Sequence, residues 1–462
     1  MTPLSAADHP RPANSLRSAA LITLLALLPA LPARGQFGGF GFGQAVGGIS
    51  IDAAGIVRNL EPGAAEPLSA QRRAALANGG IRAARGDGLR KVSLARVATA
   101  VDAAVKDGKP LAPEILFLGG LERITHVFVD PERHDIVLAG PADAAVVDAA
   151  GNVVATGSRR PLLQLEDLIV ALRAIDGARD GGMRCSIDPA PEGVARLRQF
   201  LAGQRTIGEP EGTLQRMEEL LGPQRVTVGG VPADSRFARV LVAADYRLKR
   251  LGMGLDESGI PGLSSYVAML PPNAPAAATL PRFWLEASYD PIARDPDELA
   301  WQITGRKITC LTETDLFGAD GPQRGAGAAD PVARRWCAAF SERYDDLAAK
   351  QPVFAELVNC VDLAVVAALI HGRQLDQRAG LDLGRLLDPE AVRLPTYEAP
   401  ATVPTVARGQ KRGMNWVVTA SGGVSFQPWQ FASAEHAIDA ALVATRTGAL
   451  AERGANGPCW WD

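Results

Sequence analysis

Two histidines and three acidic residues lie within ten consecutive positions of this sequence, in the stretch HVFVDPERHD. They are His126, Asp130, Glu132, His134 and Asp135. Imidazole nitrogens and carboxylate oxygens are ligands that zinc and other transition metals accept, so a hairpin that brought both histidines together would offer a metal site. However, Asp-Pro-Glu-Arg is typical of a solvated surface turn. We therefore expect a turn here and assign no metal ligand.

Asp245 is a second candidate for chemistry. Leu241 and Leu248 flank it at helical spacing, which places its carboxylate beside the apolar stripe of a predicted helix. Burial would raise the pKa of this carboxyl and suit it to act as an acid or base. Lys249 stands four residues later, the spacing of a helix ion pair. The ion pair is our preferred interpretation.

The sequence contains no cofactor motif. Tyr246 and Lys249 are three residues apart, whereas the familiar reductase pair needs four, and no glycine-rich phosphate loop follows a predicted strand. Ser264 and Ser265 lack the flanking glycines of a nucleophile elbow. We expect no cofactor. The sequence does not decide whether the protein is an enzyme, and the lack of a catalytic motif argues against it.

Apolar residues recur along the chain with a period of two in some segments and of 3.6 in others, which predicts strands and helices respectively. These elements must position the residues named above. A helix is predicted from Ser93 to a stop at Gly108, strands over 124–129 and 135–139, and hairpins around two Asp-Ala-Ala-Gly turns at Asp52 and Asp148. Further helices are predicted over 165–175, after a cap at Asp188-Pro189, over 214–221, and after a cap at Asp234-Ser235. A short strand is predicted over 225–230.

The second half of the chain adds strands and a helix pair. Strands are predicted over 282–288 and 306–312, and Asp330-Pro331 caps a long helix that runs past Tyr344. Pro352 begins its partner, which is apolar on every face and therefore favours a buried core helix over a membrane span. The fold class is thus α+β or α/β: a mixed sheet with hairpins packed by amphipathic helices, plus a C-terminal α-hairpin.

The pattern divides the chain into six segments. These are a signal peptide (1–35), a flexible Gly/Phe-rich segment (36–48), an α/β core (49–265), strands plus the α-hairpin (266–375), a Pro-rich linker (376–408) and a Trp-bearing tail (409–462). In the tail, a hairpin is predicted around Ser421-Gly-Gly423. Its aromatic residues offer a contact surface for a partner or, as we prefer, a cover on the core.

The N-terminal segment resembles an export signal. Arg11 and Arg17 precede an apolar stretch, Ala19–Leu31, that is too short to span a bilayer as a helix. Ala33-Arg34-Gly35 suggests cleavage before Gln36, with a cut after Ala33 as an alternative. A retained short anchor is the other interpretation. We expect a periplasmic or extracellular protein with no transmembrane segment after cleavage.

Composition excludes two classes of protein. The 462 residues carry 48 Lys plus Arg against 51 Asp plus Glu, a formal charge of -3, and no basic block, which argues against nucleic-acid binding. Gly (48) and Pro (33) together stay below the share of a low-complexity chain.

The five cysteines have spacings that match no zinc pattern of paired close cysteines. They are Cys185, Cys310, Cys337, Cys360 and Cys459. A bridge among Cys310, Cys337 and Cys360 remains open, and so do buried free thiols.

Several segments together resemble a known family. They are DIVLAGPA (135–142), LEDLIVALRA (165–174), CSIDPAPEG (185–193), ADYRLKR (244–250) and FAELVNCVDLAVVAALI (354–370). They are similar to secreted planctomycete proteins known as domain of unknown function 1598, over roughly 80–375. After GPA the chain reads DAAVVDAAG, where the family more often has an acidic residue, Gly and an aromatic. The resemblance implies export and no established activity.

Two functions follow as hypotheses. The first is a non-catalytic binding or structural protein of the cell envelope, whose partner is an envelope protein or polymer. The alternative is an exported hydrolase that uses His126, Asp130, His134 or Asp245.

Overall fold

The structure is a computed structural model that describes residues 46–462, except 62, 65, 78–80, 85–88, 204–209, 272–277, 280, 306, 319–320, 328–329, 410–415, 418 and 455–457. The described residues belong to one compact unit. The predicted signal peptide and most of the Gly/Phe-rich segment lie outside the described residues.

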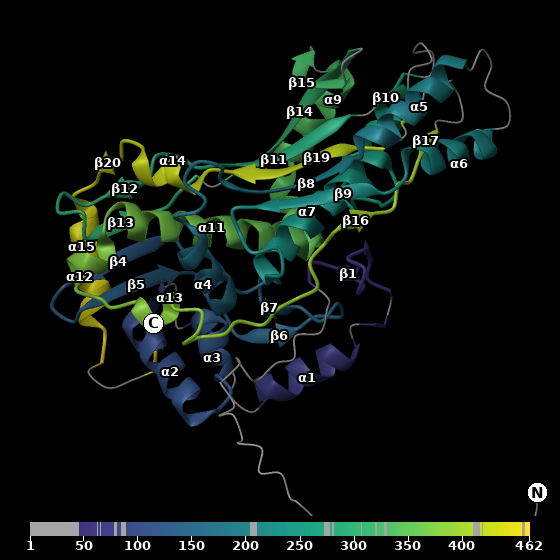
Figure 1. The fold of residues 1–462 in the computed structure, drawn as a ribbon. Helices are drawn as coiled ribbons and strands as arrows, with labels where there is room; N and C mark the ends of the chain where they lie inside the picture. The colour runs from purple at the N-terminus through teal and green to yellow at the C-terminus, as the bar shows by residue number, and fades with distance from the viewer. Residues whose placement is uncertain are drawn as a thin grey trace, which may run out of the picture. The chain divides into compact units, whose positions relative to one another are not determined.

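Helices and strands alternate along the chain (Figure 1). The helices are α1 (Glu66–Ala77), α2 (Leu94–Asp107), α3 (Pro113–Leu116), α4 (Leu165–Ala174), α5 (Pro191–Gly203), α6 (Pro210–Leu221), α7 (Arg236–Met253), α8 (Tyr266–Met269), α9 (Pro331–Glu342), α10 (Tyr344–Lys350), α11 (Pro352–Gly372), α12 (Leu375–Ala379), α13 (Gly384–Leu387), α14 (Pro428–Ser433) and α15 (Ala441–Ala451).

The strands are β1 (Ile49–Ile51), β2 (Val57–Asn59), β3 (Arg90–Ser93), β4 (His126–Asp130), β5 (Asp135–Gly140), β6 (Ala145–Val147), β7 (Val153–Ala155), β8 (Met183–Pro189), β9 (Gln224–Gly229), β10 (Ala278–Thr279), β11 (Arg282–Ser288), β12 (Ala293–Arg294), β13 (Ala300–Gln302), β14 (Lys307–Gly318), β15 (Gly321–Gly327), β16 (Thr402–Val403), β17 (Arg408–Gly409), β18 (Trp416–Val417), β19 (Ser421–Phe426), β20 (Ala437–Ile438) and β21 (Trp460–Trp461).

Two seven-stranded sheets organise the described part of the chain. The first has the order β15-β14-β11-β19-β8-β9-β16, and the second has the order β20-β12-β13-β4-β5-β3-β21. Both are mixed, because β19 runs parallel to β11 and β20 runs parallel to β12, while the other named neighbours are antiparallel. The mixed α and β content agrees with the predicted fold class.

Local sequence signals explain most of these elements. Ser93 and Ser235 cap α2 and α7 by accepting from backbone N–H groups three residues on, and Gly108 ends α2 in a left-handed conformation. The two Asp-Ala-Ala-Gly turns join β1 to β2 and β6 to β7, and the DPER turn joins β4 to β5, as predicted.

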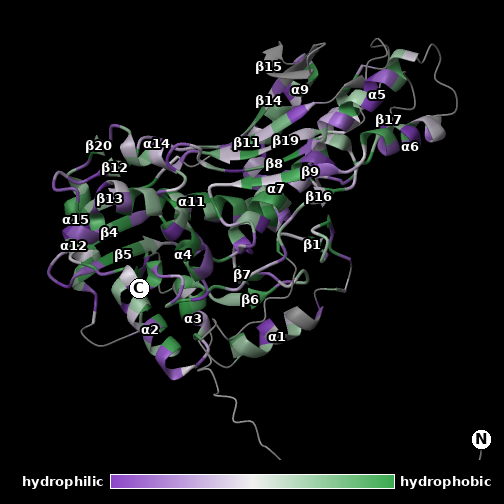
Figure 2. Cartoon of the chain, in the orientation of Figure 1, coloured by the Kyte–Doolittle hydropathy of each residue, from purple (hydrophilic) through white to green (hydrophobic). Residues whose placement is uncertain are grey.

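The core centres on α11. This helix contacts α4, α7, α12 and α14, and Figure 1 shows it running between the two sheets. It is long and apolar enough to cross a membrane, yet its apolar window is wholly buried inside the protein. Figure 2 accordingly colours α11, β4 and β5 mostly as hydrophobic. The helix packs as a core element, as its sequence predicted.

One predicted helix start and one predicted helix end are wrong. Asp188-Pro189 does not open a helix: both residues belong to β8, where they pair with β9, and α5 begins at Pro191. The helix capped by Asp330 does not run past Tyr344, because it ends at Glu342 and α10 begins after a non-helical residue, Arg343. The cap itself is present, with Asp330 accepting from the backbone N–H of Val332.

The predicted hairpin around Ser421-Gly-Gly423 is also wrong. These residues begin β19, an inner strand of the first sheet between β11 and β8. A Cβ on Gly422 would lie 2.0 Å from the Phe283 carbonyl oxygen, and one on Gly423 would lie 1.9 Å from that of Cys185. The glycines therefore permit close strand packing, whereas in the sequence they resemble a turn.

The tail is part of the core and not a cover on it, because β19 is an inner strand and Phe426, Trp429 and Trp460 are buried. The segment predicted as a linker also packs: α13 contacts α2 and α4.

Candidate functional site

The two histidines of the HVFVDPERHD stretch do not converge. His126 pairs with Ala139 at one end of the β4–β5 hairpin, whereas His134 lies in the turn at the other end. The His134 Nδ1 lies 3.3 Å from the carbonyl oxygen of Ala379, and Glu132 is exposed. No group of three His, Cys, Asp or Glu side chains suited to a metal occurs among the described residues.

Asp130 and Asp135 form a buried ionic cluster with Arg453. The Arg453 Nη1 lies 2.8 Å from Asp135 and 3.6 Å from Asp130. Asp135 also accepts hydrogen bonds from the Ser93 hydroxyl (2.5 Å) and the Ala95 N–H (2.8 Å), at the start of α2. Burial raises the pKa of Asp135, and these donors oppose that rise. The cluster joins the C-terminal segment to α2 and the second sheet.

Asp245 forms the predicted ion pair with Lys249. The Lys249 Nζ lies 2.6 Å from both carboxylate oxygens and donates to the Gly422 carbonyl oxygen at 3.1 Å. Asp245 is fully buried, and burial raises the pKa of its carboxyl to about 7 although Lys249 lowers it. The pair therefore links α7 to β19.

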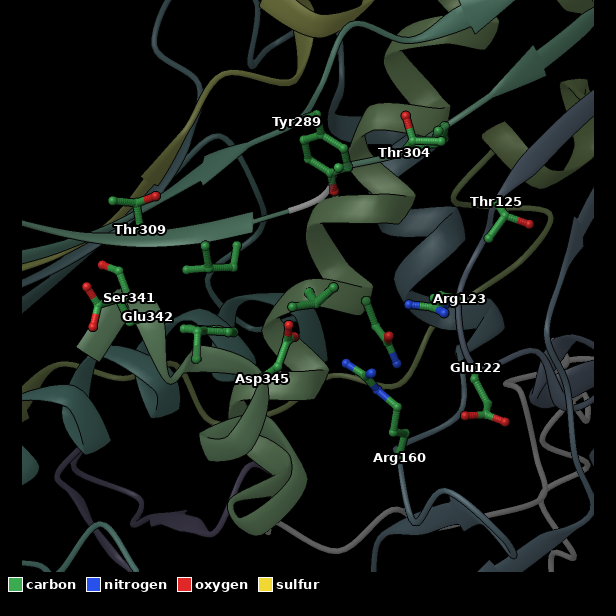
Figure 3. A pocket seen from close by; sticks show the side chains of 16 residues that line it. Glu122, Arg123, Thr125, Arg160, Tyr289, Thr304, Thr309, Ser341, Glu342 and Asp345 are labelled. Atoms are coloured by element: carbon green, nitrogen blue, oxygen red, sulfur yellow. The ribbon is translucent and has the colours of Figure 1, made fainter. Parts of the chain in front are cut away.

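A cavity of about 720 Å³ opens where the ends of the two sheets meet α9, α10 and α11 (Figure 3). We call it the α10 cavity. In the view of Figure 3, Glu122 and Arg123 lie on one side and Ser341 and Glu342 on the other, with Arg160 and Asp345 between them. The remaining lining residues are Thr125, Tyr289, Ile303, Thr304, Gly305, Ile308, Thr309, Tyr344, Val358 and Asn359.

Arg160 and Asp345 present charged groups to this cavity that are not paired within the described part of the chain. The guanidinium of Arg160 makes no hydrogen bond or ion pair with a described residue, and neither does the carboxylate of Asp345. Both act on the buried Tyr344, whose pKa is raised chiefly by burial, further raised by Asp345 and lowered by Arg160. The cavity therefore offers a cation and an anion that a ligand can engage.

The hydroxyl groups of the cavity mostly serve the fold. Ser341 donates to the Cys337 carbonyl oxygen and accepts from the Cys310 N–H, and Tyr289 donates to Asp362. Thr125 Oγ1 lies 3.0 Å from His126 Nδ1 and donates to the Ala139 carbonyl oxygen. Because a hydroxyl has one hydrogen, His126 Nδ1 then donates to Thr125 rather than accepting from it.

A second buried cluster surrounds Arg236 at the start of α7. Its guanidinium donates to Asp167 and, at 2.6 Å, to Glu356, and lies 3.9 Å from Glu166. Burial alone would lower the pKa of Arg236, but the three carboxylates raise it. Burial and the neighbouring Asp167 raise the pKa of Glu166 to about 7.

Glu166 and Arg236 line a groove, also of about 720 Å³, between α4, the start of α7 and residues 389–396. The arginines of this groove have partners within the protein. Arg236 binds the carboxylates above, Arg173 donates to the carbonyl oxygens of Leu386, Asp388 and Val392, and Arg393 pairs with Glu390. The arginines of this groove are therefore paired within the described part of the chain.

Neither the cavity nor the Arg236 cluster could be read from the sequence. The lining of the α10 cavity comes from several short stretches between residues 122 and 359, and no motif joins them. For the Arg236 cluster, the local signal in the sequence was the adjacent pair Glu166 and Asp167 at the start of the 165–175 helix. Acidic residues at this position indicate only a favourable helix N-terminus.

The comparisons with known proteins give one family match, over part of the chain, and no activity. A family model described as "Protein of unknown function (DUF1598)" matches residues 185–266. This stretch holds β8, α5, α6, β9 and α7, and includes the CSIDPAPEG and ADYRLKR segments. The match thus supports the resemblance over part of the predicted range. No curated protein and no solved structure matches the chain.

Proposed function

We propose that this protein is an exported, non-catalytic binding protein of the cell envelope, and that the α10 cavity binds a small polar molecule with an anionic group. The observation that carries the proposal is the Arg160 guanidinium, which lines the cavity without a partner among the described residues. An acidic unit of an envelope polymer would satisfy the same chemistry.

The size and position of the cavity support a ligand site. Its volume lies within the roughly 300–1,000 Å³ of small-molecule sites, and such sites often lie where structural layers meet. A carboxylate or phosphate at Arg160 would form charge-assisted hydrogen bonds. Asp345 would then accept hydrogen bonds from hydroxyl or amino groups of the same ligand.

The geometry favours binding over hydrolysis. His126, Asp130 and His134 serve different parts of the β4–β5 hairpin, and Asp245 is bound by Lys249. In the cavity itself, the Thr125 and Ser341 hydroxyls donate to backbone carbonyl oxygens. A nucleophile needs a base that accepts its proton, and these hydroxyl protons are committed elsewhere.

The binding site can be tested with matched pairs of charged and neutral probes. We would measure the melting temperature with galacturonate against galactose, glutamate against glutamine, and glycerol 3-phosphate against glycerol. At least one anionic probe should raise it, because ligand binding to the folded state stabilises that state. Arg160→Ala should remove the shift.

Arg335→Ala is the matched control, because Arg335 is an exposed arginine on α9. It should keep the shift. The proposal fails if no anionic probe stabilises the protein, or if Arg160→Ala and Arg335→Ala behave alike.

Export is a separate prediction with its own measurement. Expression of the full chain in a bacterium with a periplasm should yield a periplasmic protein whose N-terminus, read by Edman or mass-spectrometric sequencing, is Gln36. Replacing Leu24 and Leu25 by Asp should hold the protein in the cytoplasm. An intact Met1 on periplasmic protein would instead indicate a retained anchor.

A further inference from the structure

Two of the five cysteines have their side chains in contact in the structure. Cys310 on β14 and Cys337 on α9 are free thiols whose sulfur atoms lie 3.3 Å apart, and each residue is about 3 % exposed. The other three are buried on separate elements: Cys185 in β8, Cys360 in α11, and Cys459 just before β21.

The backbone around this pair is held in place by Ser341. The Cys310 N–H donates to the Ser341 hydroxyl at 2.8 Å, and that hydroxyl donates to the Cys337 carbonyl oxygen at 2.8 Å. The strand and the helix are therefore joined beside the two thiols. A disulfide has sulfur atoms about 2.05 Å apart, so a small movement of the side chains would close the bond.

We propose that Cys310 and Cys337 form a structural disulfide in the mature exported protein. Each thiol loses one proton and one electron as the sulfur–sulfur bond forms. The electrons pass to a disulfide of a thiol–disulfide oxidoreductase, which is reduced to its dithiol. This inference rests on the proposed export, because such oxidants act in the periplasm and not in the cytosol.

The surroundings of the pair favour a permanent cross-link over a reactive redox centre. Burial raises the pKa of the Cys310 thiol well above its usual value, and Cys337 adds to the rise. A reactive cysteine instead needs an accessible thiolate. Exchange with external thiols should therefore be slow once the protein has folded.

The cross-link would also stabilise the α10 cavity. Thr309 and Ser341 both line that cavity. Thr309 is the residue before Cys310, and the Ser341 hydroxyl accepts a hydrogen bond from the Cys310 N–H. A bond between β14 and α9 fixes the wall to which both residues belong. The disulfide is thus expected to preorganise the ligand site.

Alkylation decides whether the bond forms. Protein purified from the periplasm would be unfolded in guanidinium with N-ethylmaleimide and no reductant, and its adducts counted by mass spectrometry. Three adducts on the five cysteines, with a Cys310–Cys337 cross-linked peptide after digestion, would support the proposal. Five adducts, or a bridge between another pair, would overturn it.

Refolding in a glutathione redox buffer separates this test from export. Protein made in the cytosol and refolded with oxidised glutathione should form the same bond, whether or not the chain is exported in a cell. If the bond forms only in the buffer and export fails, the proposed location is wrong and the pairing stands.

A reductant provides the second measurement. Protein that is reduced with dithiothreitol while unfolded in guanidinium, and then refolded with the reductant present, should melt roughly 5 °C below the oxidised protein, because the bond closes a loop of about 27 residues. The double variant Cys310→Ser/Cys337→Ser should not respond to this treatment, while the control Cys185→Ala should respond like the parent. An equal response in the double variant would contradict the proposal.

Discussion

Arg236 shows how one residue can hold several carboxylates in a largely buried cluster. It binds Asp167 and Glu356 directly and lies 3.9 Å from Glu166, whose carboxyl has a pKa raised to about 7. The hydroxyl of Tyr397 donates to Glu166. Negative charge thus exceeds what Arg236 alone can balance, and a proton on one carboxyl relieves the excess.

Glu166 should therefore make stability depend on pH. Its folded pKa of about 7 lies above the ordinary value of 4.5, so the folded state binds the proton more tightly than the unfolded state does. The free energy of unfolding should fall as pH rises from about 4.5 to about 7. Glu166→Gln should reduce this fall by on the order of 2 kcal/mol.

Urea unfolding at pH 5 and pH 8 would measure the effect. Glu132→Gln is the control, because Glu132 is exposed in the DPER turn. Equal pH dependence in Glu166→Gln and the parent would contradict the prediction.

At the scale of elements, α7 is anchored to β19 by an ion pair that could be predicted from the sequence of the helix. Asp245 and Lys249 are four residues apart, and the ammonium group also reaches the Gly422 carbonyl oxygen of β19. Breaking one member of a buried pair leaves an uncompensated charge, whereas replacing both by apolar residues is often nearly neutral.

Lys249→Met should lower the free energy of unfolding by about 3 kcal/mol, and Asp245→Leu/Lys249→Met should recover most of that loss. The control is Lys106→Met on α2, which breaks an exposed pair with Asp102 at the same spacing. That change should cost less than about 1 kcal/mol by chemical denaturation. Equal costs for Lys249→Met and Lys106→Met would show that the buried pair is not an anchor.

Most signals that lie within one element were predictable from sequence, Asp188-Pro189 excepted, and signals that depend on packing between distant segments were not. Ser93, Ser235 and Asp330 cap helices because a short side chain meets the backbone two or three residues on. Gly422 and Gly423, by contrast, are required by the backbones of Phe283 and Cys185, which are far away in sequence. The pairing of Arg453 with Asp135 and the lining of the α10 cavity could not be predicted either, because the residues involved are far apart in sequence.

At the scale of the whole molecule, the C-terminal segment completes both sheets. It supplies inner strand β19 to the first sheet and edge strands β20 and β21 to the second. Trp460 is buried, and Arg90 lies 4.0 Å from its ring centre. These contacts make the segment structural, whatever partner the protein has.

Truncation after Ala420 should therefore abolish cooperative unfolding, because it removes β19 together with both edge strands. Truncation after Arg453 keeps β19 and the Asp135 ion pair and removes only β21 and its flanks, so it should lower the melting temperature and leave one cooperative transition. Thermal unfolding followed by circular dichroism distinguishes the two. Cooperative unfolding of the shorter chain would refute the structural role.

The position of β19 also constrains the order of folding. Its neighbour β8 ends at Pro189, and β19 begins only at Ser421, so the middle of the first sheet cannot close until almost the entire chain has been synthesised. Until then β8 and β11 have exposed, unpaired edges, which favour aggregation. Contacts of such long sequence separation also slow folding. The nascent protein should thus depend on chaperones for longer than its locally formed hairpins and capped helices suggest.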